Sequence, residues 1–125
     1  MRTKQQYIER LSTMPPNLHM SGQKIDRTDE AQETTLNTIG LTLEYAARPE
    51  YQDLCTASPH LSGEKINRFT HIRQSREGLY KKQDMTRALC QIAGGCIQRC
   101  MGVDAANAIC NASYEADRQN DGTTE

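Results

Sequence analysis

Two cysteines, Cys96 and Cys100, stand four positions apart in the segment Cys-Ile-Gln-Arg-Cys. If this segment is helical, the two side chains share one face, with Cβ atoms about 5–6 Å apart. Thiolates this close together suit a soft metal such as zinc or the irons of an iron-sulfur cluster. The neighbouring Arg99 and the backbone dipoles favour the thiolate form. The pair is therefore the strongest candidate for a metal site in this sequence.

The same pair has a purely structural interpretation. A free cysteine is among the most buried residue types, and Cys96 and Cys100 lie on an expected apolar stripe. Two ligands also leave a tetrahedral site half empty, and the other cysteines lack the short paired spacing of a zinc knuckle: Cys55, Cys90 and Cys110. If metal binds here, we expect the missing ligands to come from outside this chain.

Other common sites lack the residues that they need. The sequence contains no Gly-x-Gly-x-x-Gly, no phosphate-binding loop and no His-Glu-x-x-His, and no nucleophile-elbow glycines flank a serine. The histidines stand in separate polar stretches, where we expect solvent-facing or structural roles: His19, His60 and His71. A run of cations predicts a solvated helix face rather than a phosphate site: Arg73, Arg76, Lys81 and Lys82.

Composition limits the classes of protein to which the chain belongs. Its 125 residues amount to one domain or a piece of one. The 15 basic and 16 acidic residues create no basic field, which argues against nucleic acid as a partner. Apolar runs are too short to span a bilayer, so we expect no membrane attachment and a cytoplasmic protein. Five cysteines without an export signal should be reduced thiols.

The first half of the chain predicts two helices and a turn. Thr3 followed by Gln6 has the spacing of a capping box, which starts a helix that ends before Met14. Residues 18–25 flank a Ser-Gly pair and predict a small hairpin or tight turn. From residues 31 to 47, apolar positions recur at three- and four-residue steps, as in an amphipathic helix.

The second half predicts a long connector over residues 50–75 and then two more helices. Ser75 is the expected cap of the first, whose apolar stripe continues through Cys96 to Cys100. Gly94-Gly95 inside this helix suggests that something approaches the backbone there. We expect Gly102 to end it and Asp104 to cap another, with an apolar side made of Ala105, Ala108, Ile109 and Ala112. The predicted fold class is all-α, with one small β-hairpin.

The sequence resembles the N-terminal region of the 4-hydroxybutyryl-CoA dehydratases (vinylacetyl-CoA isomerases), a branch of the 4-hydroxyphenylacetate 3-hydroxylase flavoprotein family. The resemblance covers essentially the whole chain, and Cys-x-Gln-Arg-Cys is its specific part, because hydroxylase members lack the cysteine pair. It is carried by Tyr7–Glu9, Gly22–Ile25, Ile66–Phe69, Gln74-Ser75, Cys96–Cys100, Gly102–Ala105, Asn107-Ala108, Tyr114-Glu115 and Asp117.

The resemblance implies a fold like that of acyl-CoA dehydrogenases. Such a protein has an N-terminal helical domain, a middle β-domain and a C-terminal four-helix bundle, and assembles as a tetramer. Residues 1–125 correspond to the first of these domains alone. The partners implied are therefore the remainder of the parent enzyme, further subunits and an acyl-CoA substrate.

The resemblance also implies cofactors and residue roles. Three cysteines and one histidine hold a four-iron, four-sulfur cluster in the dehydratases, and Cys96 and Cys100 match two of these ligands. FAD accepts an electron from the substrate, while the cluster acts as a Lewis acid on the leaving hydroxyl. Arg87 and Gln98 match positions near the active site that contact substrate or flavin. A surface arginine and a helix-packing glutamine are the alternative interpretations of these two residues.

We therefore expect the N-terminal segment of an enzyme that dehydrates an acyl-CoA by radical chemistry, and we expect this chain alone to be inactive. One alternative is the corresponding segment of a flavin-dependent 4-hydroxyphenylacetate 3-hydroxylase-type oxidoreductase, with Cys96 and Cys100 as core residues. The other is a non-catalytic helical module. The Gly94-Gly95 pair and the length of the chain depart from the family pattern.

Overall fold

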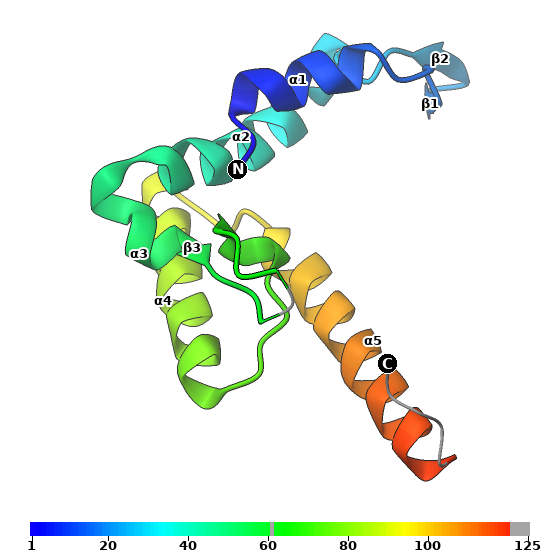
Figure 1. Ribbon diagram of the computed structural model, residues 1–125. Helices are drawn as coiled ribbons and strands as arrows, with labels where there is room; N and C mark the ends of the chain where they lie inside the picture. Colours follow the sequence, from blue (N-terminus) through cyan, green and yellow to red (C-terminus); the bar gives the residue numbers. More distant parts are fainter. Residues whose placement is uncertain (61, 121–125) are drawn as a thin grey trace.

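Helices carry most of the chain in the computed structural model, which describes residues 1–60 and 62–120 (Figure 1). This confirms the predicted all-α class with a small hairpin. The helices are α1 (Lys4–Ser12), α2 (Glu33–Ala47), α3 (Gln52–Cys55), α4 (Arg76–Ala93) and α5 (Arg99–Gln119), with short 3-10 turns η1 (Glu30–Gln32), η2 (Pro49–Tyr51) and η3 (Arg68–Thr70). None of these helices is both long enough and apolar enough to cross a membrane.

The predicted capping box starts α1. Thr3 Oγ1 accepts a hydrogen bond from the backbone N–H of Gln6, and the Gln6 side chain accepts one from the N–H of Thr3. The helix then packs on α2 at Gly40, where a Cβ would lie 2.6 Å from Cε of Lys4. Lys4 Nζ forms an ion pair with Glu44 Oε1 at 3.2 Å. Glycine at position 40 thus makes room for the lysine stem between the two helices.

The predicted hairpin is also present. Strands β1 (Leu18–Met20) and β2 (Gln23–Ile25) pair antiparallel, with Leu18 opposite Ile25. Ser21 and Gly22 between them both have positive φ, as a two-residue hairpin turn of type I′ requires. The hairpin lies at the far end of α1, away from α4 and α5 (Figure 1).

The connector between α2 and α4 is more ordered than its sequence predicts. Buried Arg68 donates hydrogen bonds to the carbonyls of Leu54 at 2.7 Å, Asp53 at 2.8 Å and Thr56, and so satisfies the C-terminal end of α3. Strands β3 (Thr56–Ala57) and β4 (Ile66–Asn67) pair beside it. These contacts fix η3, which carries the single phenylalanine of the chain into the core.

The core lies where α2, α3, α4 and the start of α5 meet. Its members are almost completely buried. One is aromatic, three have branched aliphatic side chains, and the others are small or unbranched: Ala46, Cys55, Phe69, Met85, Leu89, Ile97 and Val103. This is the kind of core that a sequence with one Phe and no Trp allows. It anchors the α4–α5 junction, on which the candidate cysteines lie.

The predicted helix through Cys96 is wrong, because α4 ends at Ala93. Gly94 adopts a left-handed conformation with φ of 72°. Its N–H bonds to the carbonyl of Gln91, and the N–H of Gly95 bonds to that of Cys90 at 2.9 Å, which is the Schellman pattern of a helix end. A Cβ built on either glycine meets no atom of the described residues within 4 Å. Backbone conformation, rather than close approach of another group, accounts for the glycine pair.

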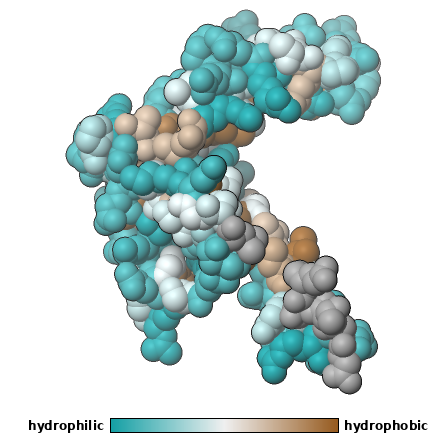
Figure 2. Space-filling view, in the orientation of Figure 1, coloured by the Kyte–Doolittle hydropathy of each residue, from teal (hydrophilic) through white to brown (hydrophobic). Residues whose placement is uncertain are grey.

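The predicted break at Gly102 is wrong as well, because both Gly102 and Asp104 lie inside α5. Val103 and Asn107 are the buried residues of this helix, whereas its expected apolar side is exposed: Ala105, Ala108, Ile109 and Ala112. Every residue from 108 to 119 is exposed, and hydrophobic side chains are visible along α5 (Figure 2). The predicted polar tail falls partly on residues 121–125, outside the described residues.

Candidate functional site

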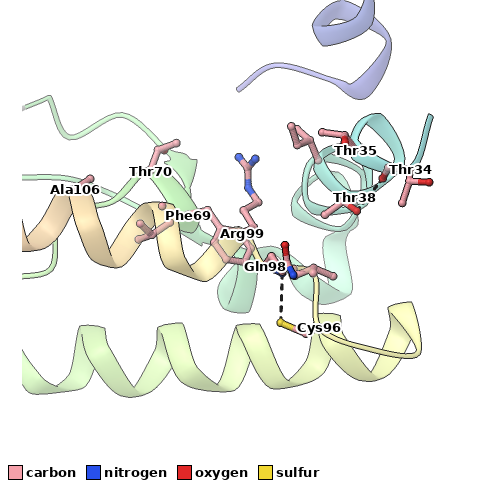
Figure 3. Close-up of a pocket in the computed structure, with 13 residues that line it drawn as sticks. Thr34, Thr35, Thr38, Phe69, Thr70, Cys96, Gln98, Arg99 and Ala106 are labelled. Carbon is pink, nitrogen blue, oxygen red and sulfur yellow. Dashed lines mark hydrogen bonds between the residues drawn. The ribbon is translucent and has the colours of Figure 1, made fainter. Parts of the chain in front are cut away.

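Cys96 and Cys100 lie at the junction between α4 and α5, but in different kinds of structure. Cys96 is exposed in the loop that precedes α5, and its Sγ accepts a hydrogen bond from the N–H of Gln98 at 3.4 Å (Figure 3). Cys100 lies in the first turn of α5, half-buried against the core. The predicted helical pair is therefore replaced by a loop cysteine and a helix cysteine at one corner of the molecule.

The N-terminus of α5 provides a favourable setting for two thiolates. Gln98 adopts a left-handed conformation with φ of 54° and supplies no side-chain cap, so the first N–H groups of the helix lack a side-chain partner from it. The positive end of the helix dipole favours negative charge at this place. Hydrogen bonds from backbone N–H groups to cysteine sulfur are also among the features that tune protein-bound iron-sulfur clusters. The donor type and setting thus fit half of such a site.

No group of three or more His, Cys, Asp or Glu side chains in residues 1–60 and 62–120 is arranged to hold a metal ion. A third such ligand therefore does not accompany Cys96 and Cys100 within the described part of the chain.

A hollow of about 900 Å³ opens beside Cys96, between α2, η3 and the first turns of α5. Threonines of α2 line one side, and Phe69, Gln98 and Arg99 line the other (Figure 3). The full lining is mainly apolar: Thr34, Thr35, Thr38, Ile39, Phe69, Thr70, Cys96, Ile97, Gln98, Arg99, Gly102, Val103 and Ala106. We call this cavity the Cys96 pocket.

Arg99 is the charged group of the Cys96 pocket. Its guanidinium carbon lies 5.4 Å from the centre of the Phe69 ring, a cation-π distance. Burial lowers the pKa of the guanidinium, and a smaller opposing effect comes from Tyr7. Nε of Arg99 is buried and has no hydrogen-bond partner among the described residues. The sequence alone indicates Arg99 only as a neighbour of the thiols, because its surroundings come from the distant segments η3 and α2.

The other predicted site residues separate in space. Gln98 lines the Cys96 pocket together with Cys96. Arg87 instead lies on the exposed surface of α4, 3.9 Å from Asp84, and does not border that pocket. Any contact of Arg87 with substrate or flavin would therefore be made at a different surface of this chain.

Asp104 clamps α5 to α4, a role that the sequence does not indicate because the partners are distant in the chain. Its two carboxylate oxygens bind Lys82 Nζ at 2.8 Å and Arg73 at 2.7 Å. The hydrogen bond from Lys82, and to a smaller extent the one from Arg73, lowers the pKa of Asp104. The cation side chains are only 10% and 12% exposed, so the solvated face predicted for Lys82 and Arg73 is wrong.

Asn107 completes the same clamp. Its Oδ1 accepts the backbone N–H of Arg73 at 2.8 Å, and its Nδ2 donates to the carbonyl of Val103 at 2.9 Å. Asp104 and Asn107 together therefore hold the first turns of α5 against α4 and against the segment of residues 71–73. Cys100 lies one helical turn before Asp104, so this clamp also fixes the position of the cysteine.

Comparisons with known proteins agree with the structural picture. The family described as 4-hydroxyphenylacetate 3-hydroxylase N terminal matches residues 3–125. The chain is 39% identical over 121 residues to the 4-hydroxybutyryl-CoA dehydratase/vinylacetyl-CoA-Delta-isomerase of Clostridium aminobutyricum, covering 95% of this chain and 25% of that protein.

A solved structure, an oxygen-tolerant archaeal 4-hydroxybutyryl-CoA dehydratase from N. maritimus, aligns with a TM-score of 0.84 and 31% identity. The alignment covers 95% of this chain and 24% of that one, so the chain spans about a quarter of the length of these relatives. This confirms the predicted resemblance and fold. The chain therefore belongs to the 4-hydroxyphenylacetate 3-hydroxylase N-terminal family.

Proposed function

We propose that this chain is the N-terminal region of a 4-hydroxybutyryl-CoA dehydratase/vinylacetyl-CoA isomerase that depends on FAD and an iron-sulfur cluster. The dehydratase/isomerase of C. aminobutyricum, at 39% identity, and the archaeal dehydratase, at 31% identity, support the dehydratase part of the proposal. The observation that carries it is the pair of cysteines at the N-terminus of α5. Because the chain spans a quarter of each relative, the activity belongs to a longer polypeptide or complex.

In this proposal Cys96 and Cys100 each bind one iron of a four-iron, four-sulfur cluster. The N–H···S bond from Gln98 orients Cys96, and the Asp104 clamp holds the turn that carries Cys100. A cysteine and a histidine from the rest of the enzyme complete the coordination, as the family resemblance implies. When bound, the cluster supplies a Lewis acid for the leaving hydroxyl and the flavin supplies an electron acceptor.

Gln98 and Arg87 have different parts in the proposal. The Gln98 amide borders the Cys96 pocket, and in this proposal it donates or accepts a hydrogen bond with substrate or flavin. Arg87, with a side chain 73% exposed, makes its contact only when another part of the enzyme covers α4. In this proposal most of the FAD pocket, the acyl-CoA site and the tetramer contacts lie in the rest of the enzyme, outside this chain. The complete enzyme is cytoplasmic.

A second candidate function follows from the description of the matching family. Residues 3–125 match a 4-hydroxyphenylacetate 3-hydroxylase N-terminal domain, which favours a flavin-dependent hydroxylase of a phenol. In that enzyme Cys96 and Cys100 bind no iron.

The test uses a full-length chimera in which this chain replaces the matched quarter of the C. aminobutyricum relative. Purified without oxygen, the chimera should convert 4-hydroxybutyryl-CoA, and it should not hydroxylate 4-hydroxyphenylacetate when supplied with reduced flavin and oxygen. The 125-residue chain alone should convert neither compound. Hydroxylation without dehydration would overturn the proposal in favour of the second candidate.

A further inference from the structure

A second cavity, with a volume of about 630 Å³, lies between α3, strand β3 and the first turns of α4. Three cations and two carboxylates line it: Lys65, Arg68, Lys81, Asp53 and Glu77. We call it the Arg68 cavity. It borders the beginning of α4, whereas Cys96 follows the end of that helix, and neither candidate cysteine lines it. The cavity is therefore separate from the proposed cluster site.

Arg68 is the buried cation of this cavity. The residue is only 6% exposed, and its Nε and Nη2 donate to the carbonyls of Leu54, Asp53 and Thr56, which fix the plane of the guanidinium. In the described part of the chain, Nη1 has no hydrogen-bond partner and no carboxylate forms an ion pair with the guanidinium. Burial lowers the pKa of Arg68, and Asp53 and Cys55 oppose this only in part. A buried charge is costly unless it is paired, so an anion in the cavity would lower the cost of burying Arg68.

The N-terminus of α4 forms another wall of the Arg68 cavity, through Ser75 and Gly78. Ser75 Oγ accepts the N–H of Gly78 at 3.1 Å, and the N–H groups of Arg76 and Glu77 have no partner within the helix. Because α4 is 18 residues long, its dipole places about half a positive charge at this end. This wall therefore attracts the same kind of ligand as Arg68 does.

The lysines and carboxylates limit the size of the anion that fits. Lys65 Nζ donates to Gln52 Oε1 at 3.3 Å, and this partner is neutral. Lys81 pairs with Glu77 at 3.3 Å, but the two side chains are 42% and 78% exposed, so water screens the pair and Lys81 can turn towards a ligand. Three cations with two carboxylates favour one compact anion over a polyanion.

We infer that the Arg68 cavity binds a phosphoryl group. Its donors come from three segments: the guanidinium of Arg68 from η3, the ammonium of Lys65 from the residue before β4, and the first N–H groups of α4. The oxygens of a tetrahedral phosphoryl group point in several directions and can meet all three, whereas a carboxylate presents two oxygens in one plane. The inference goes beyond the proposed function, because the site needs neither the cluster nor the flavin.

The test is a chemical-shift titration of the 125-residue chain with inorganic phosphate at neutral pH, with sodium chloride at the same ionic strength as the reference. The amides of residues 76–78 should shift and saturate. Lys65→Gln should raise the dissociation constant about fivefold or more. Lys24→Gln is the matched control and should leave it unchanged, because Lys24 is also an exposed lysine but does not line the Arg68 cavity.

Glu77→Gln should act in the opposite direction, because it removes a carboxylate from the cavity and frees Lys81. The affinity for phosphate should rise about threefold. Glu33→Gln is the control, because Glu33 is likewise an exposed acidic residue in the first turn of a long helix, α2, and lies outside the cavity. Arg68 stays unchanged in these variants, since it also holds the end of α3. Urea unfolding at the same midpoint as wild type checks that each variant keeps its fold.

CoA and 3′-dephospho-CoA distinguish the two sources of a phosphoryl group. If CoA binds more tightly than inorganic phosphate and loss of the 3′-phosphate removes this gain, the site holds the phosphate ester of a CoA compound. If CoA binds no more tightly than phosphate, the site holds free phosphate. Shifts that do not saturate, or equal effects of Lys65→Gln and Lys24→Gln, would show an adventitious ion only and would overturn the inference. These measurements involve neither iron nor turnover, so their outcome is independent of the proposed function.

Discussion

Lys82 on α4 donates a hydrogen bond to Asp104 on α5 at 2.8 Å, with the lysine side chain only 10% exposed. Arg73 binds the other carboxylate oxygen, so removal of Asp104 leaves two largely buried cations without their partner. Asp104 itself is 49% exposed, which allows water to offset part of the loss. We predict that Asp104→Ala lowers the free energy of unfolding by about 2 kcal/mol.

Urea unfolding of the 125-residue chain measures this loss. The control is Asp84→Ala, because Asp84 pairs with Arg87 at 3.9 Å on an exposed surface. That change should cost less than about 0.5 kcal/mol. Equal losses for the two variants would show that the clamp contributes no more than an ordinary surface ion pair.

The free energy of unfolding should fall on acidification in two separate pH ranges. Burial, with smaller effects of Arg68, His60 and Arg73, lowers the pKa of His71, so its contribution is complete above about pH 6.5 and is lost as pH falls through the native pKa. Hydrogen bonds lower the pKa of Asp104, so its contribution is complete above about pH 3.9 and disappears at lower pH.

Stability measured as a function of pH in two variants separates these contributions. His71→Gln should flatten the profile in the upper range, and Asp104→Asn should flatten it in the lower range. A wild-type profile that stays level from pH 7 to pH 5, or that His71→Gln leaves unchanged, would contradict the assignment of the upper range to His71.

The glycine pair before Cys96 gives a matched test of the helix end. Gly94 has φ of 72°, a conformation that disfavours a Cβ, whereas Gly95 is not in the left-handed region. Gly94→Ala should lower the free energy of unfolding by about 1 kcal/mol, and Gly95→Ala should leave it within about 0.5 kcal/mol. Equal stabilisation by both changes would contradict the helix end at Ala93 and would instead favour a helix that continues through Cys96.

The outer part of α5 should be the least stable helix segment of the isolated chain. Residues 108–119 are all exposed, and a helix segment this short is marginal in water without tertiary contacts. Their amides should exchange much faster than those of residues 99–107, which the Asp104 clamp holds. Mass spectrometry of exchanged peptides provides the measurement, and equal protection across α5 would contradict it.

Local sequence signals predicted the parts of the fold that depend on neighbouring residues. The Thr3 capping box, the turn at Ser21-Gly22 and the Ser75 cap all form as expected, because each involves groups within a few positions of one another. The helix end at Gly94 had a local signal too. The continuing apolar period through Cys96 concealed it, although paired glycines also mark helix ends.

Tertiary contacts determine what the sequence left open. Asp104 has the residue type of a helix cap, but its partners lie 22 and 31 positions earlier in the chain. Arg99 enters the Cys96 pocket only because η3 brings Phe69 beneath it. Neither relationship has a periodic or spacing signal, so both required the folded chain.

The most direct test of the central claim is the iron and acid-labile sulfide content of the full-length chimera, purified and reconstituted without oxygen. Wild type should bind about four of each per chain. Cys110→Ser is the matched control, because Cys110 is an exposed cysteine of α5, the helix that also carries Cys100. This variant should bind as much iron and sulfide as the wild type. Cys96→Ser and Cys100→Ser should each lose most of the iron. Full iron content in either of these variants, or none in wild type, would contradict the account.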